Sequence, residues 1–157
     1  MTNRKNIAIV GRACRLPGAS NVEGLWQLLT EARCAVSRIP EDRWSLQAYG
    51  HPRAQERGKS YTWAAGVLDD IWSFDPGVFG ISPREAEQMD PQQRMLLELT
   101  WEAFEDAGLR PSSVAGSHIG VFVGASALDY GNLRILDPSS GDAYAATGNT
   151  LSIISNR

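Results

Sequence analysis

Two cysteines and two histidines have the clearest potential for chemistry: Cys14, Cys34, His51 and His118. A thiolate activated by a histidine is a nucleophile, and closely spaced cysteines and histidines bind zinc. The two cysteines are too far apart in the sequence for a zinc site, and neither has a histidine nearby to activate it. We therefore expect reduced, partly buried thiols, and histidines at a surface or a strand edge.

Other motifs that carry chemistry are missing. The sequence has no glycine-rich phosphate loop of the Walker type, no G-x-S-x-G elbow and no H-E-x-x-H zinc motif. Its 157 residues, 43% hydrophobic and 21% charged, fit one ordinary domain. Composition and spacing alone therefore indicate no more than a soluble α/β domain.

Charge and hydropathy also restrict the classes of partner. The net charge is -3, and the arginines are scattered among carboxylates, so we expect no nucleic acid partner. No apolar run approaches the roughly 20 residues of a membrane span, and the N-terminus is too short and polar for a signal peptide. We expect no membrane partner and a cytoplasmic location.

Two apolar runs predict buried strands. Residues 7–10 are β-branched or small and end at Gly11, and residues 119–124 form a second run that glycines interrupt. Such runs are typical of central strands in a mixed sheet with helices on both faces.

Three helices have clear start signals. Ser20 and Glu23 have capping-box spacing before a helix over residues 20–33. Ser82, Pro83 and Glu85 form a capping box that predicts a short helix. Asp90 with Pro91 predicts a longer helix over residues 91–107, with Gly108 as its stop. In the longer helix we expect an ordinary ion pair between Arg94 and Glu98.

The remaining segments are less regular. Residues 37–61 are either a solvated loop or a contact surface for another subunit or domain, and residues 63–79 form short extended pieces or a hairpin. We expect a turn-rich loop at residues 137–141 and a short helical piece at residues 142–149. Residues 150–154 resemble the opening of a buried element, so the sequence looks cut after Arg157.

Several strings, in order, resemble the β-ketoacyl synthase (ketosynthase) domain of type I polyketide synthases, in the thiolase-like superfamily. The strings lie at residues 7–19, 39–44, 79–94, 101–108, 120–124, 129–130, 147–149 and 155–157. The strongest match runs from Phe79 through Arg94 and continues over residues 101–103 and 105–108. The sequence departs from the family pattern at four residues, where we expect changes in local packing only: Arg12, Leu16, Ala65 and Val67.

The resemblance implies a fold and a domain boundary. It implies an α/β fold in which helices flank a mixed sheet. This fold would be the N-terminal portion of a thiolase-like fold, and therefore incomplete. Residues 1–157 would be one domain, truncated before the catalytic cysteine. The nucleophilic cysteine and both catalytic histidines are expected beyond Arg157, so we assign no catalytic, metal or cofactor residue here and expect the chain to be inactive alone.

The resemblance also implies an activity and partners. The full-length protein would be an acyltransferase of the 3-oxoacyl synthase type, in polyketide or fatty acid biosynthesis. It would condense an acyl thioester with a malonyl-type extender carried by the phosphopantetheine of an acyl carrier protein. It would work as a homodimer beside neighbouring polyketide synthase domains. Residues near the active-site mouth or the dimer interface would be Asp129, Tyr130, Thr147, Gly148 and Asn149.

A different class of function stays open. The alternative is a non-catalytic interaction module that pairs with a ketosynthase or a carrier protein. Against this alternative, half of a two-sheet fold would leave apolar faces and unpaired strand edges exposed.

Overall fold

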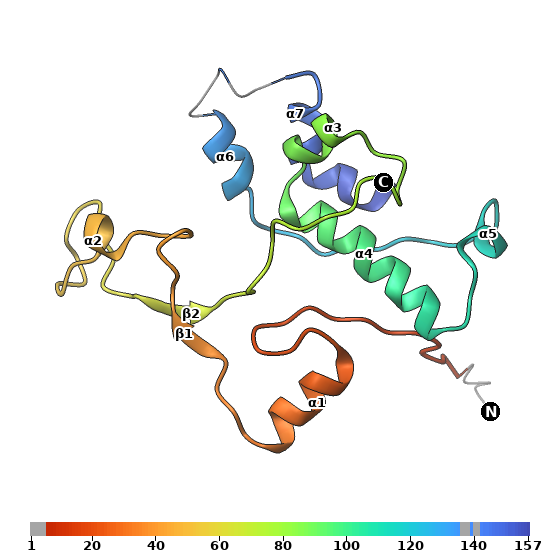
Figure 1. Cartoon of the computed structure of the whole chain (residues 1–157), viewed down its shortest axis with the longest axis horizontal. Helices are drawn as coiled ribbons and strands as arrows, with labels where there is room; N and C mark the ends of the chain where they lie inside the picture. Colours follow the sequence, from red (N-terminus) through yellow and green to blue (C-terminus); the bar gives the residue numbers. More distant parts are fainter. Residues whose placement is uncertain (1–5, 136–138, 140–141) are drawn as a thin grey trace, which may run out of the picture. The chain divides into compact units, whose positions relative to one another are not determined.

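The computed structural model describes residues 6–135, 139 and 142–157. The chain divides into two compact units. Figure 1 shows the ribbon, with colours that follow the sequence from the N-terminus to the C-terminus. Residues 14–69 form one unit, and residues 6–13 together with residues 70–157 form the other. Apart from residue 139, the predicted loop at residues 137–141 lies outside the described residues.

The first unit begins with helix α1 (Val22–Thr30). Its N-cap is Asn21, whose side chain accepts a hydrogen bond of 2.8 Å from the backbone N–H of Gly24. The predicted cap at Ser20 is wrong by one residue, because asparagine satisfies the free N–H groups of a first turn as well as serine does. The helix also ends before the predicted boundary at Arg33.

A two-stranded sheet follows in the same unit. β1 (Val36–Arg38) and β2 (Ala64–Gly66) pair antiparallel, with Ser37 opposite Ala65. Of the two alternatives predicted for residues 63–79, a short extended piece is confirmed as β2. A hairpin within the segment is wrong, because the partner strand β1 precedes the long intervening loop.

That intervening loop carries the short helix α2 (Leu46–Tyr49). Ser45 caps it by accepting a hydrogen bond of 3.3 Å from the Ala48 N–H. The sequence did not predict this helix, because four residues are too few for a periodic apolar pattern. Residues 39–45 and 50–61 belong to no named helix or strand, as predicted, whereas residues 37–38 end strand β1.

In the second unit, α3 (Pro83–Gln88) and α4 (Pro91–Asp106) begin at the predicted residues. Each helix has a proline in its first turn, preceded by a side-chain cap from Ser82 for α3 and from Asp90 for α4. Gly108, at a φ of 66°, ends α4 as predicted, because a left-handed residue there lets the next N–H groups return to the last carbonyls.

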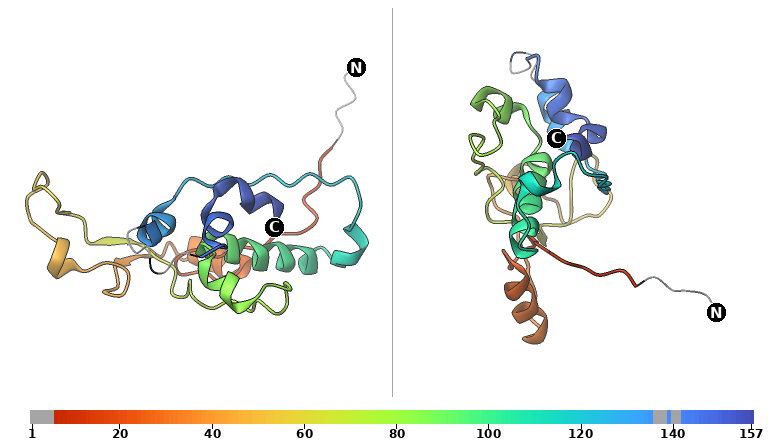
Figure 2. Two further views of the ribbon diagram at one scale, coloured as in Figure 1. Left: turned by 90° about the horizontal axis from the view of Figure 1, so that it is seen from above. Right: turned by 90° about the vertical axis from the view of Figure 1, so that its right-hand side faces the viewer.

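Shorter helices complete this unit. They are α5 (Pro111–Val114), α6 (Asp129–Ile135), α7 (Ala145–Asn149) and the 3-10 helix η2 (Leu151–Asn156). α7 lies inside the predicted helical piece at residues 142–149, and η2 contains the buried Ile154. α7 packs on α3 and η2 packs on α4, as Figure 2 shows from two sides. α5 and α6 were not predicted.

The two predicted central strands do not form in this structure. Residues 7–10 and 119–124 are extended but unpaired, and Ile7 and Phe122 are each 96% exposed. A β-strand is stable only beside another strand, and the described part of the chain offers neither run a partner. The prediction from apolar runs was wrong here because periodicity reports burial and cannot supply the neighbouring strand.

The first of these segments is nevertheless held against α4. A Cβ built on Gly11 would lie 2.2 Å from the Ala103 carbonyl oxygen, so only glycine fits there. The next backbone N–H, from Arg12, donates to Asp106 Oδ2 at 2.9 Å.

The most buried part of this unit is where α3 meets α4. Met89 is fully buried, and the buried residues around it are Ala86, Gln88, Asp90, Gln93, Arg94 and Ile154. The core is thus small and rich in polar groups, and several of these groups form the hydrogen bonds described below.

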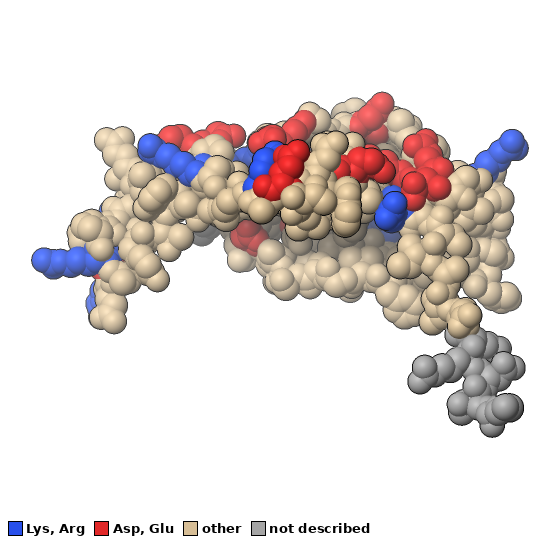
Figure 3. Space-filling model, turned by 90° about the horizontal axis from the view of Figure 1, so that it is seen from below, with Lys and Arg blue, Asp and Glu red and all other residues tan. Residues whose placement is uncertain are grey.

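The surface carries charges of both signs. Acidic and basic side chains occur beside one another over the face drawn in Figure 3. In the described part of the chain, no helix combines the length and hydropathy that a membrane span requires.

Candidate functional site

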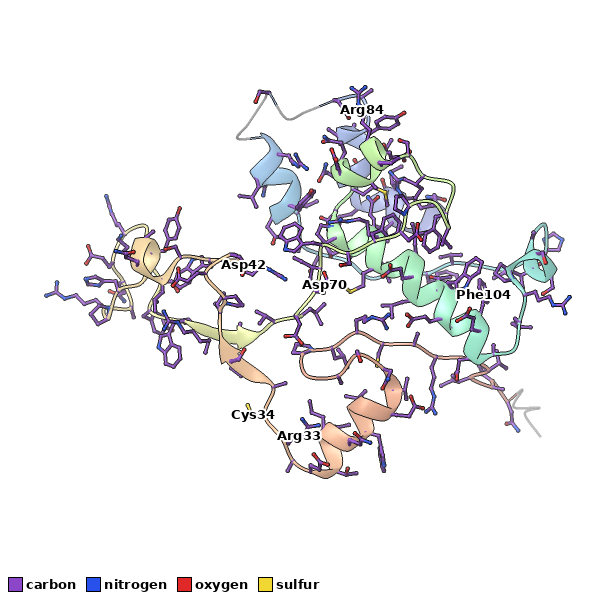
Figure 4. All side chains as sticks on the ribbon, viewed as in Figure 1. Arg33, Cys34, Asp42, Asp70, Arg84 and Phe104 are labelled. Atoms are coloured by element: carbon purple, nitrogen blue, oxygen red, sulfur yellow. The ribbon has the colours of Figure 1, made fainter. Side chains whose placement is uncertain are left out.

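The short helix α3 binds several later segments of its unit. Both ends of the helix take part, and Figure 4 labels Arg84 at its first turn. We call the turn of Gln88, Met89 and Asp90, which joins α3 to α4, the α3–α4 corner.

Two residues in the first turn of α3 form ion pairs with residues that come much later in the chain. Arg84 Nε lies 2.8 Å from Asp142 Oδ2, and Glu85 Oε1 lies 2.6 Å from Arg157 Nη1. The hydrogen bond from Arg84, together with one from the backbone N–H of Tyr144, lowers the pKa of Asp142. The same bond and the charge of Asp142 raise the pKa of Arg84.

The last turn of α3 accepts hydrogen bonds from side chains far along the chain. Tyr130 Oη and Arg134 Nη2, both from α6, donate to the Glu87 carbonyl at 2.9 and 2.6 Å. Asn149 Nδ2, from α7, donates to the Gln88 carbonyl at 3.2 Å. These donors satisfy carbonyls that a helix end leaves free, and the Arg134 cation also suits the negative end of the helix dipole.

α7 touches the α3–α4 corner through its backbone. A Cβ built on Gly148 would lie 2.3 Å from the Gln88 carbonyl oxygen, so the two backbones pack with no room for a side chain. The Asp90 N–H donates to the Gly148 carbonyl at 2.9 Å. Gln93, which is 2% exposed, donates from Nε2 to the Thr147 carbonyl at 3.1 Å.

The structure brings together most of the residues that the resemblance singled out. Tyr130, Gly148 and Asn149 all contact the end of α3, and the Thr147 carbonyl accepts a hydrogen bond from Gln93 in the first turn of α4. The side chain of Asp129 does not join them: it lies exposed in the first turn of α6.

Residues that the sequence did not single out hold this arrangement as well. Arg134 donates to the Tyr130 hydroxyl at 3.0 Å and lies 5.3 Å above the Tyr130 ring. Arg134 had no sequence signal beyond its place four residues after that tyrosine. Glu85 was read only as a capping residue, and Arg157 only as part of the resemblance.

Arg94 is buried as well. Its side chain donates from Nη1 to the Trp72 carbonyl at 3.1 Å. The predicted ion pair with Glu98 stays a prediction.

The residues with the clearest chemical potential lie elsewhere. Cys14 is half-buried and Cys34 is exposed, and both are free thiols. His51 accepts a hydrogen bond of 3.1 Å at Nδ1 from the Arg53 N–H, and His118 is exposed. Within the described residues no group of three His, Cys, Asp or Glu side chains is arranged to hold a metal ion.

An apolar pocket of about 170 Å³ lies along α4. Phe104 and Leu97 of α4, Val121 of the extended segment, and Ile154 and Arg157 near η2 are among the residues that line it. It has no cluster of polar groups that would orient a small substrate.

Comparison with known proteins identifies the chain. Residues 4–157 match the family model described as the β-ketoacyl synthase N-terminal domain. The chain belongs to the β-ketoacyl synthase family. Within this family it is 47% identical over 153 residues to the polyketide synthase ThaG of Burkholderia thailandensis, covering 97% of the chain and 3% of that protein. It is also 47% identical over 153 residues to erythronolide synthase EryA3 of Saccharopolyspora erythraea, covering 96% of the chain and 5% of that protein.

Solved ketosynthase structures share the fold. The oxazolomycin ketosynthase domain OzmH KS7 of Streptomyces albus JA3453 has a TM-score of 0.86 and 36% identity, covering 97% of this chain and 27% of that one. The ketosynthase from module 6 of the bacillaene synthase of Bacillus subtilis 168 has a TM-score of 0.72 and 41% identity, covering 80% of this chain and 21% of that one. The chain therefore has the fold of the N-terminal portion of a thiolase-like ketosynthase and spans about a quarter of a solved ketosynthase chain.

Proposed function

We propose that this chain is part of a ketosynthase domain that performs decarboxylative Claisen condensation in a type I polyketide synthase. The observation that carries the proposal is the match of residues 4–157 to the β-ketoacyl synthase N-terminal domain. The structural similarity to OzmH KS7, at a TM-score of 0.86, supports it. In this proposal the enzyme is an acyltransferase of the 3-oxoacyl synthase type.

The proposed reaction has two stages. A cysteine thiolate attacks the carbonyl carbon of an acyl thioester on an acyl carrier protein, which forms acyl-cysteine and releases the carrier thiol. A malonyl-type thioester then loses CO₂, and the resulting carbanion attacks the acyl-cysteine carbonyl. A carbon–carbon bond forms, the carbon–sulfur bond breaks, and the thiolate is regenerated. The nucleophilic cysteine and the two histidines would lie beyond Arg157.

The residues of this chain would supply architecture to that reaction. The Tyr130 hydroxyl and the Asn149 amide donate hydrogen bonds to α3 carbonyls, and Gly148 packs against the α3–α4 corner. We therefore propose that these three residues position α6 and α7 on α3. The side chains of Asp129 and Thr147 stay exposed. We propose that these two face the active-site mouth or the dimer interface.

Partners and location belong to the same proposal. The enzyme would act as a homodimer, on an acyl carrier protein, beside other domains of a cytoplasmic polyketide synthase. The phosphopantetheine arm that carries the acyl groups is part of the carrier protein, and we assign no residue of this chain to it.

The test compares two proteins: this chain alone, and a complete ketosynthase domain that contains it. Acyl loading and malonyl-carrier decarboxylation are followed by mass spectrometry of the protein and by release of CO₂. We expect both activities in the complete domain only, and unchanged in a Cys14→Ser, Cys34→Ser double variant of that domain. Activity in the chain alone, or loss of activity in the double variant, would contradict the proposal and indicate that Cys14 or Cys34 is the nucleophile.

A second candidate is a non-catalytic module that pairs with a ketosynthase or a carrier protein, in which that partner covers the apolar segments that the rest of the domain covers in the first proposal. The unpaired segments at residues 7–10 and 119–124 expose apolar side chains, which a partner would cover. Light scattering distinguishes the two candidates. The chain is mixed with an acyl carrier protein, and separately with a complete ketosynthase, and the mass of any complex is measured. A stable complex without catalysis in any context would favour the module.

A further inference from the structure

The ion pair between Glu85 and Arg157 is shielded on both sides, in contrast to the neighbouring pair of Arg84 and Asp142. The Glu85 and Arg157 side chains are 23% and 12% exposed, whereas Arg84 is 73% exposed and Asp142 is 14% exposed. A shielded pair is weakened little by salt and solvent, so it holds its two segments in a defined geometry. The two segments are 72 residues apart in the sequence.

Arg157 directly follows η2, whose position has a second anchor. Ile154 is 8% exposed and lines the apolar pocket with Leu97 and Phe104 of α4. Apolar packing alone permits small slides and rotations, because it has no directional preference. The ion pair adds direction, since a guanidinium donates along fixed N–H bonds to a carboxylate oxygen.

Glu85 lies on a helix, α3, that is held in place at both ends. α3 is fixed at its start by the Ser82 cap and at its end by the donors from α6 and α7. A carboxylate on that helix is therefore a fixed point from which the backbone at Arg157 is oriented. The capping-box reading of the sequence gave Glu85 no such role.

We propose that Glu85 is a positioning residue for the ketosynthase reaction, acting through Arg157 to fix the course of the backbone that leads from η2 toward the nucleophilic cysteine. The inference rests on the proposed function, in which that cysteine lies beyond Arg157. Glu85 touches no reacting atom. Its loss is expected to slow the chemical step while substrate binding is kept, because small misplacements of a reacting group are costly.

The test uses the complete ketosynthase domain and two matched variants on the same helix. Glu85→Gln removes the charge that faces Arg157, and Arg84→Gln removes the neighbouring pair with Asp142. Acylation of the cysteine is measured as kcat and KM for the acyl donor, below the melting temperature of the weaker variant. Amide hydrogen exchange of residues 151–157 is measured in parallel.

We expect Glu85→Gln to lower kcat at least about tenfold with KM within about twofold, and to speed exchange in residues 151–157. Arg84→Gln is expected to change neither, and the reversed pair Glu85→Arg with Arg157→Glu to recover part of kcat. Equal effects of Glu85→Gln and Arg84→Gln, or a loss of activity that follows the unfolded fraction, would overturn the proposal.

Two further outcomes also decide the matter. If Glu85→Gln is insoluble, Arg157→Lys replaces it, because lysine keeps the charge and gives up the guanidinium geometry. A kcat lowered about threefold or more then supports the proposal, and an unchanged kcat contradicts it. If the wild-type domain fails to condense, the proposed function fails, and the exchange data still show whether Glu85 anchors Arg157.

Discussion

The carbonyl oxygen of Gln88 occupies the space that a side chain at Gly148 would need. A Cβ at position 148 would approach that oxygen to 2.3 Å, closer than real contacts allow. The end of α3 and the last residues of α7 therefore pack backbone to backbone, and this contact holds α7 against the α3–α4 corner.

Gly148→Ala is expected to destabilise the complete ketosynthase domain by about 1–3 kcal/mol, because the backbone must shift to admit a methyl group. The measurement is the free energy of unfolding from urea titration. Thr147→Ala is the control: its side chain is exposed and its hydroxyl donates to the Tyr144 carbonyl within the same turn, so a change within about 0.5 kcal/mol is expected. Equal stability of the Gly148→Ala variant and the wild type would contradict the packing.

Asn149→Asp tests the donors to α3 with an isosteric change. The asparagine amide donates to the Gln88 and Ala145 carbonyls, and a carboxylate can donate to neither. We expect a loss of at least about 2 kcal/mol at neutral pH, because two acceptors then face a negative charge. The loss should shrink as the pH falls and the aspartate is protonated. A variant as stable as the wild type at neutral pH would exclude the contact.

Tyr130→Phe is expected to cost less, about 0.5–1.5 kcal/mol. The reason is that Arg134 continues to donate to the same Glu87 carbonyl when the hydroxyl is gone. Urea titration beside the Asn149→Asp variant provides the comparison. A loss for Tyr130→Phe greater than that for Asn149→Asp would show that the tyrosine hydroxyl is the main anchor of α6.

The pair of Arg84 and Asp142 predicts a modest sensitivity to acid. The pKa of Asp142 is lowered in the folded protein, so the pair stabilises the fold above the ordinary aspartate value, about 3.9, and this contribution is lost as the pH falls further. The melting temperatures of the wild type and Asp142→Asn should therefore differ at pH 6 and converge as the pH falls below the lowered pKa of Asp142. A difference that is constant with pH would show that the carboxylate charge contributes nothing.

The unpaired segments predict a difference in hydrogen exchange. In the complete domain we expect residues 7–10 and 119–123 to join strands, so their amides should exchange slowly. In this chain alone the same amides should exchange at rates near those of unstructured peptides, since they have no strand partners. Equally fast exchange in both proteins would mean that these apolar runs serve another purpose.

The sequence predicted what local chemistry determines. Ser82 with Pro83, and Asp90 with Pro91, satisfy free N–H groups within one turn, and Gly108 permits the left-handed conformation that ends α4. Such signals depend on few neighbours, so they hold in isolation.

What depends on distant partners could not be predicted in the same way. The strand character of residues 7–10 requires a neighbouring strand, and none is paired with it in the described part of the chain. The family resemblance pointed to Tyr130 and Asn149, but their contacts with α3 carbonyls appear only in three dimensions. The pairing of Glu85 with Arg157 spans 72 residues and has no local pattern.

The partners of α3 also have a consequence for synthesis on the ribosome. A helix of six residues is too short to persist by itself in water. Its side-chain donors and ion partners follow it by 43 to 72 residues. At about 5–20 residues per second, the last of them emerges roughly 4–14 s later. The nascent chain therefore carries this motif unstructured for that time, and α3, α6 and α7 become ordered together in one late step.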